Sequence, residues 1–174
     1  NDKKVALYKK AAEKFNSNAA QYNLAVTYLK MDKMADAKVA LAKCEKDADW
    51  NNAMGVIALR EDNLDEASKY FAAAGNETAK ENAAVISILK GDYQAAAAAL
   101  ANAKGFNAAL AQLLVGNNAP AAALKCECAK TAYLRAVAAA RNGDAEAVKT
   151  NLEAAKKCEK LAERAAKDVE FAQY

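Results

Sequence analysis

The sequence predicts an all-α solenoid of about five stacked helix pairs, and three observations support this fold class. A short polar turn recurs along the chain, and alanine is abundant while proline occurs once, which favours helix almost everywhere. Small residues also recur at fixed distances from the turns. The turns carry Asp or Asn at intervals of 30, 30, 25 and 27 residues, at Asp32, Asp62, Asp92, Asn117 and Asp144. Periods of this size are typical of solenoids.

The small residues mark the places where the two helices of a pair are expected to cross. In the second helices they are Ala37, Ala67, Ala97 and Ala122, and twelve residues earlier the first helices carry Ala25, Gly55, Val85 and Leu110. A bulky side chain at a crossing holds two backbones apart, so the small pairs permit close antiparallel contact. A glycine inside a helix costs roughly 0.5–1 kcal/mol relative to alanine. Gly55 therefore supports a close crossing at its position.

This pattern resembles the tetratricopeptide repeat. The large-then-small pair of the family's first helix is matched by Leu24–Ala25 and Met54–Gly55, its aromatic by Tyr28, and its second-helix pattern by Ala67, Phe71 and Ala74. Later repeats depart from the pattern, with Ile88 and Leu113 at the aromatic position and Val85 and Leu110 at the small one. The intervals are also shorter than the family's usual period of about 34 residues. The resemblance implies a right-handed solenoid with a concave groove.

The chain is expected to form a single repeat domain over residues 1–174. A helix from Asp2 to Phe15 precedes the repeats and is typical of the second helix of a pair, which suggests excision from a longer array. The five pairs are expected at residues 19–46, 50–74, 77–104, 106–128 and 131–156. A charged helix over 158–172, with its core from Cys158 to Phe171, is expected to cover the open end of the stack, as terminal repeats require.

Composition excludes several classes of function. The formal net charge is +3 and the charges alternate in sign along most helices, unlike the concentrated basic face of a nucleic-acid-binding protein. No apolar run approaches the roughly 20 residues of a membrane-spanning helix, so direct membrane insertion is not expected. The chain has no histidine, which removes histidine bases, Ser-His and Cys-His pairs and histidine metal ligands. We therefore expect no enzyme activity and no cofactor.

One face of the first helices is predicted to bind a partner. In a solenoid of this type the first helices line the concave side, where the predicted ladder is Tyr22, Asn52, Asn82, Asn107 and Tyr133, with a basic border of Lys30, Arg60, Lys90 and Arg141. Asn amides can bond a peptide backbone as donor and acceptor, and Lys or Arg can meet acidic groups. The alternative is that Asn and the basic residues only serve helix ends through capping and the helix dipole. The predicted function is a scaffold for a protein or peptide, with a structural spacer or dimerisation module as the alternative.

The four cysteines are Cys44, Cys126, Cys128 and Cys158. Cys126 and Cys128 are expected two apart on a helix, where they would point about 200° apart, so a zinc site is not expected. A disulfide remains open in an oxidising compartment. The favoured interpretation is that the thiols are small buried hydrophobes, with Cys44 at a small-residue position of its repeat.

The segment from Leu89 to Tyr174 has a second, looser resemblance. Its motifs LKGDYQAA, NAALAQLLVG and YLRAVAAARNGD are similar to the repeat region of certain cell-envelope proteins of Bacteroidetes. That resemblance implies a periplasmic or outer-membrane-associated location, with the cytoplasm as the alternative. The first residues, NDKKVALYKK, do not have the pattern of a secretory signal.

Overall fold

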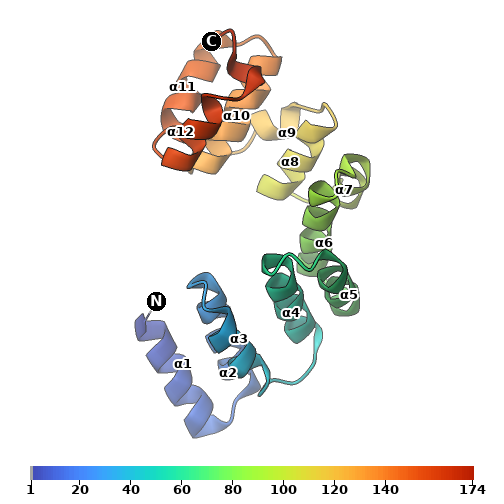
Figure 1. Ribbon diagram of the computed structural model, residues 1–174, viewed down its shortest axis with the longest axis vertical. Helices are drawn as coiled ribbons and strands as arrows, with labels where there is room; N and C mark the ends of the chain where they lie inside the picture. The colour runs from blue at the N-terminus through green and yellow to red at the C-terminus, as the bar shows by residue number, and fades with distance from the viewer. Residues whose placement is uncertain (1) are drawn as a thin grey trace. The chain divides into compact units, whose positions relative to one another are not determined.

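The computed structural model describes residues 2–174, and every regular element in that range is a helix (Figure 1). The predicted all-α class is therefore confirmed. The chain divides into two compact units, one that extends to Ile86 and one from Ser87 to Tyr174. Each unit has its own buried core, and most consecutive helices within a unit pack against one another.

The first unit contains α1 (Asp2–Phe15), the helix pairs α2 (Asn18–Lys30) with α3 (Met34–Leu41) and α4 (Ala48–Arg60) with α5 (Leu64–Ala74), and most of α6 (Glu77–Leu89), which continues into the second unit. Side chains of Ser17, Asp47 and Asn63 accept backbone N–H groups at the starts of α2, α4 and α5. The pair α4–α5 begins and ends close to where the sequence predicts it, and α2 and α3 also begin close to their predicted starts.

The second unit contains shorter second helices than the sequence predicts. Its elements are α7 (Tyr93–Ala99), α8 (Phe106–Leu114), α9 (Ala119–Ala122), α10 (Ala129–Arg141), α11 (Ala145–Ala155), α12 (Glu159–Ala165) and a 3-10 turn, η1 (Val169–Phe171). The predicted helix from Pro120 to Cys128 is wrong, because α9 ends at Ala122. The guanidinium of Arg135 donates to the carbonyl oxygens of Leu124 and Cys126, and these bonds hold the following segment in a non-helical path.

Three other helices also differ from the predicted lengths. The second helices expected to end at Lys46 and Lys104 stop at Leu41 and Ala99, as α3 and α7. The predicted helix from Cys158 to Phe171 is divided into α12 and η1. The break falls at Asp168, whose carboxylate accepts the N–H of Glu170 and the hydroxyl of Tyr133. These bonds start a new turn and anchor it to α10.

All five helix pairs share one turn geometry. The residues with positive φ are Asp32 (60°), Asp62 (61°), Gly91 (80°), Gly116 (92°) and Gly143 (74°). The N–H of each following residue donates to the carbonyl oxygen five positions earlier, as from Lys33 to Tyr28 and from Asp144 to Ala139. Glycine takes the left-handed position where it is present, because it has no Cβ. Asp92 and Asp144 instead accept N–H groups as N-caps of α7 and α11.

In the last three pairs the left-handed residue is a glycine that lies one position before the Asp or Asn used in the sequence-based alignment. That alignment is therefore wrong by one residue in these pairs. Five positions after the left-handed residue lie Ala37, Ala67, Ala96, Ala121 and Val148, each 0% exposed. Seven positions before it lie Ala25, Gly55, Ala84, Ala109 and Ala136, and all of these are buried. The predicted crossing residue Ala122 is exposed, and Val85 and Leu110 are only half-buried. A small residue therefore occupies the first-helix position in every pair.

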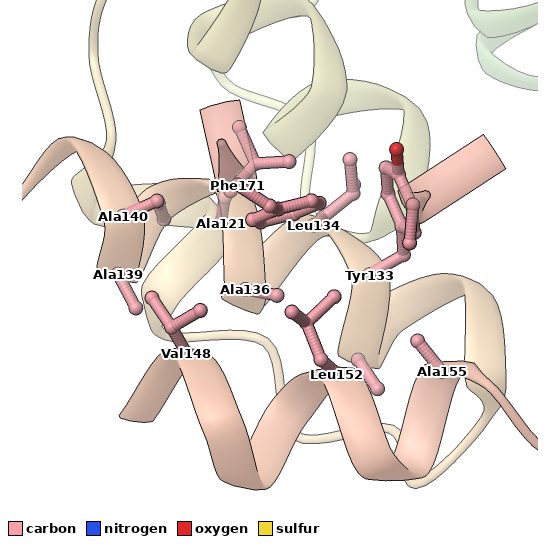
Figure 2. Close-up of a cluster of buried hydrophobic side chains, with 14 of the residues drawn as sticks. Ala121, Tyr133, Leu134, Ala136, Ala139, Ala140, Val148, Leu152, Ala155 and Phe171 are labelled. Atoms are coloured by element: carbon pink, nitrogen blue, oxygen red, sulfur yellow. The ribbon is translucent and has the colours of Figure 1, made fainter. Parts of the chain in front are cut away.

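The core of the second unit is built around α10. Nine residues of this helix are buried, and five of them are alanines that let neighbours approach on several sides. Figure 2 shows Ala139 and Ala136 of α10 next to Val148 and Leu152 of α11. Phe171 of η1 belongs to the same cluster. The C-terminal segment is thus part of the core of this unit.

Candidate functional site: the first-helix faces

In the first unit two residues of the predicted ladder form a hydrogen bond with each other. Asn82 Nδ2 of α6 donates to Asn52 Oδ1 of α4 at 2.9 Å, across an interval of 30 residues. Both asparagines are half-buried, as is Tyr22 of α2. Burial, followed by the nearby Asp49 and Asp47 carboxylates, raises the pKa of Tyr22 above its usual value. The ladder residues of this unit therefore lie at the junctions of helices rather than fully in solvent.

Two residues of the predicted basic border bond to the preceding repeat. Arg60 Nη1 donates to the carbonyl oxygen of Leu29 at 2.5 Å, and Arg141 Nη1 donates to that of Leu113 at 2.6 Å. Each arginine lies two residues before the left-handed residue of its own turn. Each acceptor lies three residues before the left-handed residue of the preceding turn. The two bonds are therefore equivalent contacts in different pairs. They satisfy carbonyl groups at helix C-termini, which lack partners within the helix.

The other border residues lie at exposed positions. Lys30 is the last residue of α2, and Lys90 follows α6 in the turn before α7. Arg60 has a further contact with Asp32 Oδ1 at 3.4 Å, and Arg141 is paired with Glu170 at 2.6 Å.

The corrected turn alignment changes which residues are equivalent on the first helices. Ten positions before the left-handed residue lie Tyr22, Asn52, Glu81, Phe106 and Tyr133. Asn82 and Asn107 lie one residue further on. Asn107 of α8 is half-buried, and the residue that shares the position of Tyr22 and Tyr133 in its pair is Phe106.

The second unit contains an open apolar groove of about 470 Å³. Phe106, Leu110 and Leu114 follow one face of α8 at intervals of four residues and line one side of it. Tyr133 and Leu134 of α10 and Leu161 of α12 line the other side. The sequence analysis did not predict this groove. The i, i+4, i+8 spacing on α8 is the signal that could have indicated it.

Two cations lie at the apolar groove. Lys130 of α10 and Arg164 of α12 both line it, and the Arg164 guanidinium lies 5.6 Å from the centre of the Tyr133 ring. Over residues 2–174 no carboxylate lies within ion-pairing distance of either cation. The groove therefore combines a largely apolar wall with two cations, and none of the residues that line it is acidic.

Tyr133 is held in place by the C-terminal segment. It is 6% exposed, its hydroxyl donates to Asp168 Oδ2 at 2.5 Å, and its ring meets Phe171 edge to face at 5.7 Å. Burial, followed by the bond to the Asp168 carboxylate, raises the pKa of Tyr133 to about 12. Of the predicted ladder, Tyr133 is the residue that lines this groove, and it presents its ring there rather than a free hydroxyl.

The cysteines differ from the sequence-based interpretation. Cys126 and Cys128 are exposed and lie outside any helix, so they are not buried hydrophobes, whereas Cys44 and Cys158 are half-buried. All four thiols are free. Among residues 2–174 no group of three or more His, Cys, Asp or Glu side chains is placed to hold a metal ion. In the same range no helix has the length and apolar character needed to cross a bilayer.

Comparison with known proteins yields no match, either to a family or to a curated protein or solved structure. The geometry of the two units is therefore the basis for any assignment of function.

Proposed function

We propose that this chain is a non-enzymatic scaffold of the tetratricopeptide type, a right-handed solenoid whose first-helix face holds a partner protein or peptide. The common turn geometry supports the repeat assignment, together with a small residue at the same position of all five first helices. The observation that carries the binding role is the apolar groove of the second unit with its two cations. The resemblance of this unit to cell-envelope repeat proteins is the reason for placing the scaffold in a periplasmic or outer-membrane-associated assembly.

The chemistry of the groove defines the class of partner. Phe106, Leu110, Leu114 and Leu161 offer an apolar wall that a segment with two or three apolar side chains would cover. Lys130 and Arg164 would meet an Asp or Glu next to those side chains. The expected ligand is therefore a short peptide segment that combines apolar anchors with at least one carboxylate.

A selection from a random peptide library displayed on phage tests this assignment with the full chain as the target. Enriched peptides should carry apolar residues beside Asp or Glu, and their synthetic versions should bind with an affinity measurable by calorimetry. Lys130→Glu should weaken that binding by about ten-fold, which corresponds to about 1.4 kcal/mol. Leu110→Asp should weaken it at least as much, because it places a charge in the apolar wall.

Lys157→Glu is the matched control, because Lys157 is exposed and does not line the groove. It makes the same change of charge and should leave the affinity unchanged. Circular dichroism of each variant checks that the helices are intact. Enriched peptides that bind equally well to Lys130→Glu and Leu110→Asp, or no enrichment at all, would contradict a binding role for this groove.

A second candidate function, a structural spacer, is favoured by the contacts of the C-terminal segment. Asp168 and Phe171 bind Tyr133, and Glu170 pairs with Arg141, so residues predicted to face a ligand already contact the chain itself. A spacer would show no peptide enrichment. Removing the contact, by Phe171→Ala, would then lower stability without creating a binding site.

A further inference from the structure

The segment between α9 and α10, residues 123–128, presents two thiols to solvent. Cys126 and Cys128 are separated by Glu127 alone, and both are exposed. A side chain of α10 holds this connector in place. Arg135 Nη1 donates to the carbonyl oxygen of Leu124 at 2.8 Å and to that of Cys126 at 3.2 Å. The two cysteines therefore lie on a backbone that is anchored at its centre, and not on a free loop.

Cys128 is in a position that favours its thiolate. It is the N-cap of the 13-residue helix α10, and its Sγ lies 3.2 Å from Thr131 Oγ1. The Thr131 hydroxyl, then the Thr131 N–H and then the Cys126 thiol stabilise the thiolate, and the pKa of Cys128 falls to about 7. The positive end of the helix dipole acts in the same direction. The thiolate is the nucleophilic form of cysteine.

The spacing of the two cysteines permits a disulfide within the connector. Two residues separated by one other have Cα atoms at most about 7 Å apart, and less where the chain bends. A disulfide spans Cα separations of about 4.4–6.8 Å. The Cys126 thiol is also among the groups that lower the pKa of Cys128, which indicates that the two side chains lie close together. Bond formation therefore requires adjustment of the connector only.

We propose that Cys126 and Cys128 are a site of reversible thiol–disulfide exchange whose oxidant is a small-molecule disulfide. The Cys128 thiolate attacks one sulfur of the oxidant, forming a mixed disulfide and releasing one thiolate. Cys126 then gives its proton to solvent and attacks Cys128 Sγ, which breaks the mixed disulfide and releases the second thiolate. The two leaving thiolates take up protons from solvent. The protein loses two electrons and two protons, and the oxidant is reduced to two thiols.

Oxidised glutathione is the probe, and intact mass spectrometry of the full chain with peptide mapping is the readout. The wild-type chain should lose two hydrogens and carry a Cys126–Cys128 disulfide without a stable adduct. Cys126→Ser should stop at a glutathione adduct on Cys128, because the resolving thiol is missing. A persistent adduct in the wild-type chain, or a disulfide that instead involves Cys44, Cys158 or a second molecule, would overturn the proposal.

Cys158 provides a control within the same molecule. It also precedes a helix with an extended backbone, but it is half-buried and has no second cysteine beside it in sequence. At pH 7 about half of Cys128 would be thiolate, against a few per cent for an ordinary cysteine, and the lower intrinsic nucleophilicity offsets part of this gain. Cys128 should therefore react about five-fold faster than Cys158. Equal rates would overturn the assignment of Cys128 as the attacking thiol.

Thr131→Val keeps the shape of the side chain and removes its hydroxyl. It should lower the rate at Cys128 near pH 7 and move the pH midpoint of the reaction upward, while rates well above the midpoint stay the same. Thr150→Val, at an exposed position on α11, is the matched control and should change neither. An unchanged midpoint in Thr131→Val would overturn the role given to Thr131.

Discussion

Gly55 of α4 lies directly against the ring of Phe71 in α5. A Cβ added at Gly55 would lie 2.5 Å from Phe71 Cε1 and 2.6 Å from Cδ1, closer than real side chains approach. Phe71 is 2% exposed and its ring is surrounded by the core of the first unit, so it has little space to move away. The absence of a side chain at residue 55 is what allows α4 and α5 to cross at this distance.

Gly55→Ala should therefore destabilise the protein although alanine is the better helix former. The gain in helix propensity is about 1 kcal/mol, while overpacking of a dense core costs about 1–3 kcal/mol. We expect a net loss of about 1–2 kcal/mol, measured by urea denaturation. In a Phe71→Leu background the same change should cost less, because the atoms that clash are gone. An equal loss in both backgrounds would mean that the ring is not the obstacle.

Arg141→Met should lower stability by about 1–3 kcal/mol, because it leaves the Leu113 carbonyl without its charged donor and removes the ion pair with Glu170. Methionine preserves most of the apolar stem. Lys30→Met is the matched control, since Lys30 occupies the same position relative to its turn but is exposed. The control should change stability by no more than about 0.5 kcal/mol. Equal effects of the two substitutions would show that the bond between repeats contributes nothing.

Stability should fall between pH 10 and pH 12 through Tyr133. Its pKa is raised from 10.0 to about 12, so the folded state favours the neutral phenol. This contribution is fully present below pH 10, the value for an unfolded chain, and is lost as the pH rises through about 12. Tyr133→Phe should make the unfolding free energy less dependent on pH in this window. A phenolate absorbance titration should also lose its highest midpoint, and an unchanged titration would contradict the bond to Asp168.

Local signals in the sequence predicted much of this fold. Helix starts at capping residues such as Asp47 and Asp144, and the ends of α4 and α5, follow from short-range chemistry that the sequence displays. The alignment of the last three pairs failed because Asp92, Asn117 and Asp144 resemble the turn residues Asp32 and Asp62. In those turns glycine takes the left-handed position, and Asp92 and Asp144 become the N-caps of the helices that follow.

The remaining differences arise from contacts between residues distant in sequence. The end of α9 depends on Arg135, which lies 11 residues after its acceptor Leu124, and the break before η1 depends on Tyr133. Local propensity favours helix in both segments, so it could not predict either ending. The apolar groove was missed for a related reason. Phe106, Leu110 and Leu114 have the pattern of a core face, and only the positions of α10 and α12 leave that face open.

The central claim is that the left-handed turn residue sets one common packing position in every helix pair. Thermal and urea unfolding of Ala121→Leu and Ala122→Leu tests it most directly. The two substitutions are chemically identical and adjacent in α9, but Ala121 is 0% exposed and Ala122 is exposed. Ala121→Leu should cost about 1–3 kcal/mol and Ala122→Leu no more than about 0.5 kcal/mol. The opposite order, or equal losses, would contradict the account.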